Sequence, residues 1–399
     1  MSVMTIDQLD VQDKSVLTRV DFNVPLDGDG LITDDRRIRM ALPTIRSIID
    51  RGGRAILMSH LGRPSGTGYQ PELGLEVVAQ RLGTLLETTV KHVPGSCVGS
   101  DVIEAAQHLG NGDVMLLENL RFEAGEKGGD HDFAGELSRL GDLYCNDAFG
   151  TSHRADASMV AVAECFQPDE RAAGLLLAKE IHFLSDAIES PVRPFVAITG
   201  GAKVSDKLKA LENLLGKVDH LLVGGAMAYT LLQATGRSVG RSLLEPEMVE
   251  RAAQILARSE QTCTSIHLPT DHVCAETLQP GVATCICDGD IPEEMMGLDI
   301  GPATADRFCE LVSAAGTVVW NGPLGAFETP PFDAGTRMVA QSVAEATERG
   351  AVTILGGGDT AAAAATFSLD DRFSHISTGG GASLQMLEGE PLPGVEVLR

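Results

Sequence analysis

Short apolar runs alternate with longer amphipathic segments along most of this chain. In the first half, the runs that predict strands are residues 16–20, 55–58, 114–117 and 142–145. In the second half, they are residues 195–199, 220–223, 317–320, 352–355 and 375–377. Strands separated by helical patterns form βαβ units, whose crossovers are right-handed. The pattern therefore predicts an α/β protein with parallel sheets.

A long helix is predicted near the middle of the chain, over residues 172–189. Pro191 and Pro194 end it, because proline cannot continue the hydrogen bonding of a helix. A chain of 399 residues is also long enough for two domains of ordinary size. We therefore expect an N-terminal domain over residues 1–171, a bridging helix over 172–190 and a C-terminal domain over 191–387.

The composition is strongly acidic, with 56 Asp and Glu against 31 Lys and Arg and a formal net charge of −25. Such a surface repels nucleic acid and anionic membranes, so we expect neither as a partner. The acid excess has two interpretations: an ordinary acidic bacterial protein, or a halophilic one, in which salt screens the repulsion among carboxylates. The scarcity of lysine, with none after Lys217, favours the halophilic interpretation.

The N-terminal residues have neither the basic nor the apolar region of a signal peptide. The longest apolar runs, such as residues 361–365, are far shorter than a membrane span. The eight cysteines lie mostly in apolar segments and lack the paired spacing of a zinc site. We expect a cytoplasmic protein whose cysteines are reduced and structural.

Polar and basic residues follow the predicted strands of the first half, where ligands of open α/β sheets bind. These residues are Asp21, Asn23, Arg37, His60, Arg63, Arg121 and Arg154. Guanidinium groups bind phosphate or carboxylate through two parallel hydrogen bonds, so the cluster indicates an anion site. A single arginine is more often a member of a surface ion pair, and we interpret Arg36 and Arg39 as solvated.

Four glycine clusters follow predicted strands in the second half, beginning at Gly200, Gly224, Gly356 and Gly379. Bare backbone amides at strand ends and helix starts bind phosphate, so these clusters indicate a nucleotide site. After the first cluster, we expect a helix with Lys203 and Lys207 on one face, four residues apart. The alternative is a solvated lysine pair.

Asp359, which follows the third glycine cluster, has two interpretations. It either caps a helix or reaches a phosphate that carries magnesium. The sequence contains no Walker A spacing, and no Gly-x-Gly-x-x-Gly motif opens the chain. These absences argue against an ordinary P-loop enzyme and against a simple dinucleotide dehydrogenase.

Eight segments together resemble the phosphoglycerate kinase family, in family order over nearly the whole chain. They are residues 19–25, 59–64, 117–122, 146–150, 200–204, 320–325, 356–360 and 377–383. The resemblance implies two Rossmann-like three-layer domains with parallel sheets, facing each other across a hinged cleft. It also implies a tail over residues 388–399 that returns to the N-terminal domain. The implied activity is reversible phosphoryl transfer between 1,3-bisphosphoglycerate and ADP, giving 3-phosphoglycerate and ATP in glycolysis and gluconeogenesis.

The same resemblance implies roles for individual residues. The phosphoglycerate site would comprise Asp21, Asn23, Arg37, His60, Arg63, Arg121 and Arg154. The nucleotide site would comprise Gly200, Gly201, Lys203, Lys207, Asn321, Gly357, Gly358, Asp359 and Thr360, with Glu328 on the ribose. Arg37 and Lys203, with amides near Gly357 and Gly380, would stabilise the transferred group, and the nucleotide phosphates and Asp359 would hold Mg²⁺. We expect a monomer, with a dimer as the alternative.

The sequence departs from the family pattern at two places. Gly224-Gly225-Ala226 replaces a fuller glycine triplet, and Asp156 stands where a histidine is frequent and adds negative charge near the anion site. Two rival interpretations are a non-catalytic nucleotide-binding or scaffold protein and an NAD-dependent dehydrogenase. The loss of Arg37, Lys203 or Asp359 would favour the first rival, and all three residues are present.

Overall fold

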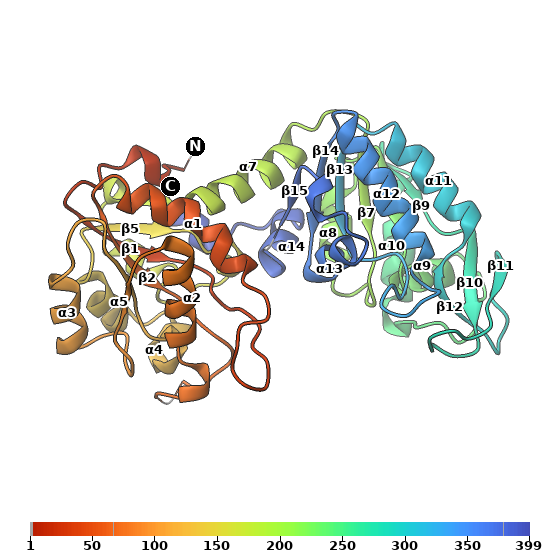
Figure 1. The fold of residues 1–399 in the computed structure, drawn as a ribbon. Coiled ribbons are helices and arrows are strands. Elements are labelled where there is room, and N and C mark those ends of the chain that lie inside the picture. The colour runs from red at the N-terminus through yellow and green to blue at the C-terminus, as the bar shows by residue number, and fades with distance from the viewer. Residues whose placement is uncertain (1–2, 67, 378) are drawn as a thin grey trace. The chain divides into compact units, whose positions relative to one another are not determined.

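The computed structural model describes residues 3–66, 68–377 and 379–399, and the chain divides into two compact units (Figure 1). Unit 1 comprises Met1–His182 and Pro391–Arg399, and unit 2 comprises Phe183–Glu390. Helix α7 (Leu175–Glu189) begins in unit 1 and ends in unit 2. The C-terminal residues pack within unit 1, where the Asn146 side-chain amide donates a hydrogen bond to the Gly394 carbonyl at 2.9 Å.

Unit 1 is built on a six-stranded parallel sheet in the order β3-β4-β2-β1-β5-β6. Its strands are β1 (Ser15–Arg19), β2 (Arg54–Met58), β3 (Val90–His92), β4 (Val114–Leu116), β5 (Leu143–Asn146) and β6 (Arg171–Ala173). Its helices, besides α7, are α1 (Arg36–Ile49), α2 (Glu76–Leu86), α3 (Ser100–Gln107), α4 (Ala124–Gly128), α5 (His131–Ser138), α6 (Ala161–Glu164) and α15 (Pro393–Glu396).

The register of this sheet places several strand ends at one level. Arg19, the last residue of β1, is aligned with Met58 of β2 and with Asn146 of β5. The strands are apolar because side chains on both faces are buried against helices, as in other parallel sheets. The polar segments that follow these strands therefore all leave the sheet at the same edge.

Unit 2 contains a second six-stranded parallel sheet, in the order β15-β14-β13-β7-β8-β9, and a small antiparallel sheet in the order β11-β10-β12. The parallel strands are β7 (Phe195–Thr199), β8 (His220–Val223), β9 (Ser265–His267), β13 (Thr317–Asn321), β14 (Val352–Gly356) and β15 (His375–Ile376). The antiparallel strands are β10 (Asp271–Ala275), β11 (Cys285–Asp288) and β12 (Met296–Ile300). The helices are α8 (Leu208–Leu214), α9 (Met227–Ala234), α10 (Val249–Ser259), α11 (Pro302–Ser313), α12 (Ala334–Glu348), α13 (Gly358–Thr366) and α14 (Gly381–Leu387).

The α/β class with two parallel sheets is confirmed, and every predicted strand is present with ends within one residue of the prediction. The short strands β3, β6 and β9 and the antiparallel sheet were not predicted, because their apolar runs are too short or too interrupted. The predicted start of the long helix at residue 172 is wrong. Residues 171–173 instead form the edge strand β6, and the Gly174 amide donates to the Asn146 carbonyl at 2.7 Å before α7 begins.

The loops that follow β7 and β13 approach each other very closely in unit 2. The amide of Gly200 donates to the Asn321 carbonyl at 3.0 Å, and the amide of Gly201 donates to the Pro323 carbonyl at 2.9 Å. A Cβ atom added to Gly200 would overlap with the carbonyl oxygen of Pro323. Glycine is therefore required at position 200 by the close approach of two backbone segments.

Replacing Gly200 with alanine should destabilise the protein, because the added methyl group must displace the neighbouring backbone. We expect a loss of about 1–3 kcal/mol in the free energy of unfolding, seen as a lower thermal midpoint. Gly135→Ala is the control: it lies in α5, with no described atom within 4 Å of the added Cβ. That change should stabilise the helix by up to about 1 kcal/mol. Equal midpoints for the two variants would contradict this account of the packing.

Candidate active site

Four arginines surround His60 at the carboxyl edge of the sheet of unit 1. His60 follows β2 and is only 3% exposed. Its pKa is lowered far below the ordinary value, first by burial and then by repulsion from four guanidinium groups, which belong to Arg19, Arg121, Arg37 and Arg154. The His60 ring is therefore neutral, and the positive charge of the site resides on the arginines.

Carboxylate and amide side chains from the segment after β1 hold part of this cluster in place. Asp21 accepts a hydrogen bond from Arg37 at 2.6 Å, and its other carboxylate oxygen lies 4.0 Å from His60 Nδ1. The Asn23 side-chain oxygen accepts from the amide of Gly62 at 2.8 Å. Because the Arg37 side chain is 37% exposed, Asp21 orients it without burying all of its donors.

Arg121 and Arg154 lie within electrostatic reach of each other but are compensated to different extents. Arg154 donates to Asp156 at 2.9 Å, so the unusual aspartate neutralises part of the charge here. Arg121 donates to the Gly62 carbonyl at 2.7 Å, while its buried Nε has no hydrogen-bond partner among the described residues. The pKa of Arg121 is lowered, first by burial and next by Arg154. An incompletely satisfied guanidinium group beside a second one is suited to an anionic ligand.

Two predicted residues of unit 1 have a weaker connection to the cluster. Asn23 contacts the cluster through the amide of Gly62 and through its own backbone amide, which donates to Asp21 at 3.4 Å. Arg63 is exposed on the loop that follows β2, and no ion pair to it is seen in the described part of the chain. The structure therefore brings Asp21, Arg37, His60, Arg121 and Arg154 together and leaves Arg63 at the periphery.

A buried chain of hydrogen bonds, which was not predicted from the sequence, fixes the tautomer of His60. Arg19 is 1% exposed, and one of its terminal nitrogens lies 3.2 Å from His60 Nδ1. Guanidinium groups only donate, so Nδ1 accepts and the neutral ring carries its proton on Nε2. The Nε of Arg19 donates to the Ser158 hydroxyl at 2.9 Å, and that hydroxyl donates to Glu126 at 2.6 Å. Only the position of Arg19 at a strand end could have signalled this chain of hydrogen bonds in the sequence.

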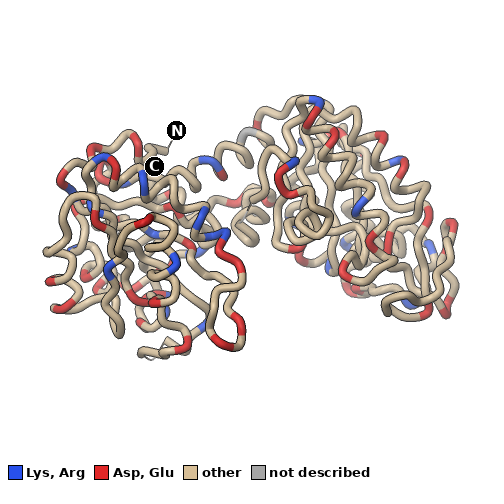
Figure 2. The backbone as a smooth tube through the Cα atoms, viewed as in Figure 1, with Lys and Arg blue, Asp and Glu red and all other residues tan. Residues whose placement is uncertain are grey.

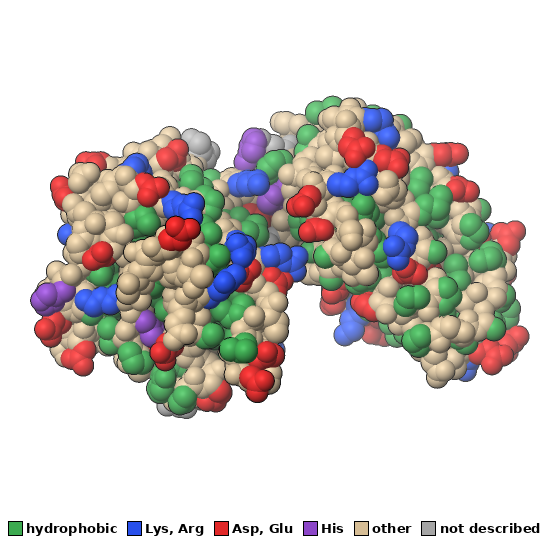
Figure 3. All heavy atoms as spheres, in the orientation of Figure 1, with side chains coloured by type: hydrophobic (Ala, Val, Ile, Leu, Met, Phe, Trp, Pro, Cys, Tyr) green, Lys and Arg blue, Asp and Glu red, His purple; other side chains and the backbone are tan. Residues whose placement is uncertain are grey.

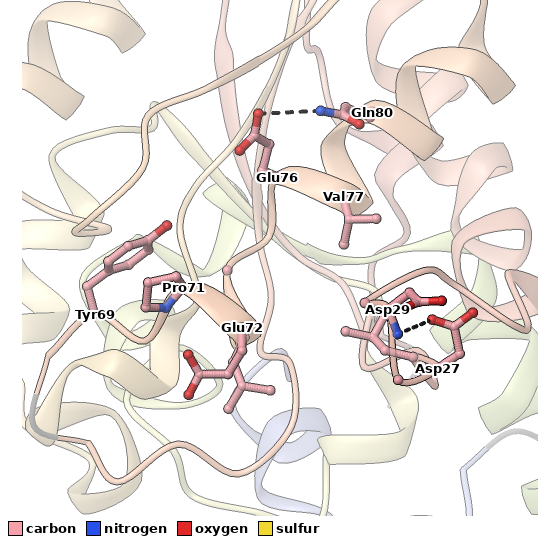
Figure 4. A pocket seen from close by; sticks show the side chains of 13 residues that line it. Asp27, Asp29, Tyr69, Pro71, Glu72, Glu76, Val77 and Gln80 are labelled. Carbon is pink, nitrogen blue, oxygen red and sulfur yellow. Dashed lines mark hydrogen bonds between the residues drawn. The ribbon is translucent and has the colours of Figure 1, made fainter.

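Acidic residues are distributed over both units, as Figure 2 shows. On the face seen in Figure 3, Lys and Arg side chains of unit 1 gather over the start of α1. A cavity of about 670 Å³ beside α2 is different in character: its lining includes Asp27, Asp29, Glu72 and Glu76 (Figure 4). Such a lining repels phosphate, so this cavity is not the anion site.

In unit 2, the first two glycine clusters do not present bare amides. The amides of Gly200 and Gly201 are bonded within the fold, as described above. Those of Gly224 and Gly225 donate to the carbonyls of Thr199 at 2.9 Å and Leu324 at 2.8 Å. The expectation of bare amides at these two clusters is therefore wrong, because close packing of three strand-end loops uses them.

The third and fourth clusters lie at the starts of helices. Gly357 has φ +87° and immediately precedes α13, and Gly380 has φ +48° and precedes α14. The first amides of a helix have no acceptor within that helix, so the amides of Gly358 and Asp359 face outward at the start of α13. Together with the helix dipole they favour a negatively charged ligand. The Thr360 hydroxyl instead accepts from the amide of Gly322 at 2.7 Å.

Lys207 is the basic residue that the structure brings to the start of α13. Its amino group donates to the Asn321 side-chain oxygen at the end of β13. Burial lowers the pKa of Lys207, and Asp206, Asp359 and Glu388 oppose that effect, so Asp359 lies within electrostatic reach. Lys207, Asn321 and Asp359 thus converge, whereas Lys203 and Glu328 are exposed.

The expectation that Lys203 and Lys207 share one face of a helix is wrong. Helix α8 begins only at Leu208, and residues 201–207 form bends and turns. The Ser205 amide and hydroxyl both bond to Glu245, at 3.0 and 2.6 Å, while Val204 is fully buried. These tertiary contacts hold the segment out of the helical conformation.

The sequence matches one known protein family over most of its length. The family model of phosphoglycerate kinase matches residues 6–390. The chain belongs to the phosphoglycerate kinase family. It is 54% identical to the phosphoglycerate kinase of Rhodopirellula baltica and 50% identical to that of Salinibacter ruber, in each case covering 100% of this chain and 99% of the relative.

Solved structures of the kinase agree with the fold. The phosphoglycerate kinase of Coxiella burnetii superimposes with a TM-score of 0.90 at 39% identity, covering 99% of this chain and 98% of that one. The enzyme from Pyrococcus horikoshii gives a TM-score of 0.83 at 31% identity, with the same coverage. The expected phosphotransferase activity of glycolysis is thereby confirmed over the dehydrogenase and scaffold interpretations. In the described part of the kinase, no helix has the length and apolarity to cross a membrane.

The neutral state of His60 predicts how this residue affects stability as the pH falls. Folding lowers the pKa of His60 from its ordinary value of 6.5. Below that pH, the unfolded chain therefore binds a proton at His60 and the folded chain does not. This group therefore stabilises the fold above about pH 6.5 and loses that contribution as the pH falls, by up to about 1.4 kcal/mol per pH unit. His60→Gln cannot titrate and should lose less stability between about pH 7.5 and 5.5.

Chemical denaturation of both proteins across that pH range measures the effect. The unfolding free energy of the unmodified kinase minus that of His60→Gln should fall steadily as the solution becomes more acidic. Parallel curves would mean that His60 is protonated normally in the folded protein.

Proposed function

We propose that unit 1 of this kinase binds 3-phosphoglycerate or 1,3-bisphosphoglycerate. The residues assigned to this site are Asp21, Asn23, Arg37, His60, Arg63, Arg121 and Arg154. The observation that carries the proposal is the buried Nε of Arg121, which has no hydrogen-bond acceptor among the described residues, in the neighbourhood of Arg154. His60 would add a neutral donor through Nε2, so that it contributes a hydrogen bond without adding charge.

We infer that unit 2 binds ADP or ATP around the start of α13. The residues assigned to this site are Gly200, Gly201, Lys203, Lys207, Asn321, Glu328, Gly357, Gly358, Asp359 and Thr360. The outward amides of Gly358 and Asp359 and the nearby amino group of Lys207 support phosphate binding here. Gly200 and Gly201 would contribute backbone surface rather than amide donors, and Glu328 would contact the ribose.

We propose that Mg²⁺ accompanies the nucleotide and is held mainly by its phosphates, with Asp359 as the protein ligand. The described residues contain no ready group of three or more His, Cys, Asp or Glu ligands. That finding suits Mg²⁺, which commonly takes one or two carboxylates and completes its shell with phosphates and water. When bound, the ion would neutralise phosphate charge. Asp359 is exposed in the first turn of α13, and its carboxylate would reach the ion from there.

The proposed mechanism needs no general base, because the attacking carboxylate or β-phosphate oxygen is already ionised near neutral pH. The protein must align the reactants and compensate the charge on the transferred group. Arg37, Lys203 and the amides near Gly357 and Gly380 would do this. Because the two substrates are assigned to different units, we also propose a hinge-bending motion about α7 that brings them together and excludes water.

The direct test is ATP formation from ADP and 1,3-bisphosphoglycerate, followed with and without Mg²⁺. Turnover should depend on the metal, and Asp359→Asn should raise the Mg²⁺ concentration for half-maximal rate about tenfold or more. Asp370→Asn is a matched control, since Asp370 is exposed beyond the far end of α13. An unchanged Mg²⁺ requirement in Asp359→Asn would remove this residue from the metal site.

Arg37→Ala and Lys203→Ala should each lower kcat by roughly a hundredfold or more, because both side chains are assigned to the charge of the transition state. Binding of each substrate measured separately should change much less. Steady-state kinetics combined with calorimetry separates these effects. Near-normal turnover in either variant would show that the residue has no such role.

We also propose that the enzyme acts as a cytoplasmic monomer adapted to high salt. With 56 acidic and 31 basic side chains, the compact state repels itself in dilute buffer. Salt screens this repulsion, and it equally screens the attraction between the arginines of unit 1 and an anionic substrate.

The melting temperature should therefore rise from low to molar KCl, and the KM for the phosphoglycerate substrate should rise over the same range. Differential scanning calorimetry and initial-rate kinetics in one KCl series measure both quantities. A melting temperature that is flat or falling would refute salt adaptation and leave the kinase assignment intact.

A further inference from the structure

Three of the eight cysteines lie together on the antiparallel sheet of unit 2. Cys274 of β10 is paired with Cys285 of β11, and His272 is paired with Cys287. Since residues two apart on a strand share a face, these three thiols form one group. The sulfur atoms of Cys285 and Cys287 are 3.8 Å apart, and the Cys274 thiol also contacts that of Cys287.

The other exposed cysteines differ from this group. Cys263 and Cys165 contact only backbone carbonyls, of Gly216 at 3.6 Å and Ala161 at 3.4 Å, among the described residues. Within the thiol group, exposure falls stepwise: Cys285 is exposed, Cys287 is 8% exposed and Cys274 is fully buried. A reagent from solvent therefore meets Cys285 first, with Cys287 directly behind it.

The position of β11 allows the two sulfur atoms to approach further. It is the edge strand of the sheet, bonded on one side only, to β10. A disulfide requires the sulfur atoms to close from 3.8 Å to about 2 Å. Side-chain rotation and adjustment of a short edge strand can supply this movement without disturbing the pairing of β10 with β12.

We propose that Cys285 and Cys287 form a reversible dithiol–disulfide site that reacts with small-molecule disulfides of the glutathione type. The Cys285 thiol loses its proton, and the thiolate attacks one sulfur of the reagent. The S–S bond of the reagent breaks, a mixed disulfide forms, and the departing thiolate takes up the proton and leaves as a thiol. The Cys287 thiolate then attacks the Cys285 sulfur, closes the internal disulfide and releases the second thiol. Two protein thiols are oxidised, and the reagent is reduced to two thiols. The site lies outside the residues assigned to either substrate.

The resting state of this site is the dithiol. Burial and the neighbouring Cys287 thiol raise the pKa of Cys285 above its ordinary value. The Cys285 thiol is therefore protonated near neutral pH, and the disulfide reagent is needed as the oxidant that converts the pair.

The test uses the full-length kinase incubated with oxidised glutathione, then denatured and treated with N-ethylmaleimide. Cleavage after Glu276 separates Cys274 from the other two thiols before mass spectrometry. The fragment with Cys285 and Cys287 should carry neither glutathione nor maleimide and should be lighter by a pair of hydrogens. The Cys274 fragment should carry maleimide. Dithiothreitol should restore maleimide labelling of both residues.

Variants separate the two steps. Cys287→Ser should stop at the mixed disulfide, so that glutathione remains on Cys285, and Cys285→Ser should remove the reaction at this site. Cys263→Ser is the control and should leave the internal disulfide unchanged. Persistent glutathione on Cys285 in the unmodified protein, or a disulfide that includes Cys274, would overturn the proposal. Both of these outcomes are measured on the unmodified protein, so they decide the proposal even if a variant does not fold.

Discussion

The side-chain cluster around His60 in unit 1 depends on holding several guanidinium groups close together. Each is compensated to a different extent. Arg37 is paired with Asp21, Arg154 with Asp156, and Arg19 is linked through Ser158 to Glu126. Among the described residues, the Arg121 side chain donates to one backbone carbonyl and its Nε has no partner, while Asp156 and Glu126 oppose the lowering of its pKa. Incomplete compensation leaves positive potential at the edge of the sheet, while the partial ion pairs reduce the repulsion that folding must overcome.

His60 fits within this arrangement because it is neutral. A protonated ring among four arginines would add a fifth charge in a buried position. Arg19 occupies Nδ1, and Nε2 remains as the donor. Although the net charge of the chain is −25, the charge at this edge of the sheet is positive, because it is set by the neighbouring side chains. At the start of α13, the positive groups are helix amides and the half-buried Lys207, in place of an arginine cluster.

Much of the fold and of the side-chain cluster around His60 could be predicted, because buried parallel strands leave strong apolar runs in the sequence and their carboxyl ends meet at one edge. This logic predicted that Asp21, His60, Arg121 and Arg154 lie at one edge, where the structure brings them together. It missed Ser158 and Glu126, which reach Arg19 only through tertiary contacts. It also misassigned the amides of Gly200 and Gly201, since a glycine required by close packing looks the same in sequence as one that binds phosphate. The loop conformation around Lys203 depends on Glu245, far along the chain.

The central claim is that the incompletely satisfied guanidinium group of Arg121 binds the acid substrate independently of the nucleotide. Isothermal titration calorimetry of Arg121→Ala with 3-phosphoglycerate, and separately with ADP, tests it most directly. Loss of a charged hydrogen bond should weaken 3-phosphoglycerate binding by about tenfold or more, with ADP affinity nearly unchanged. Unaltered 3-phosphoglycerate binding, or an equal loss for both ligands, would contradict the account.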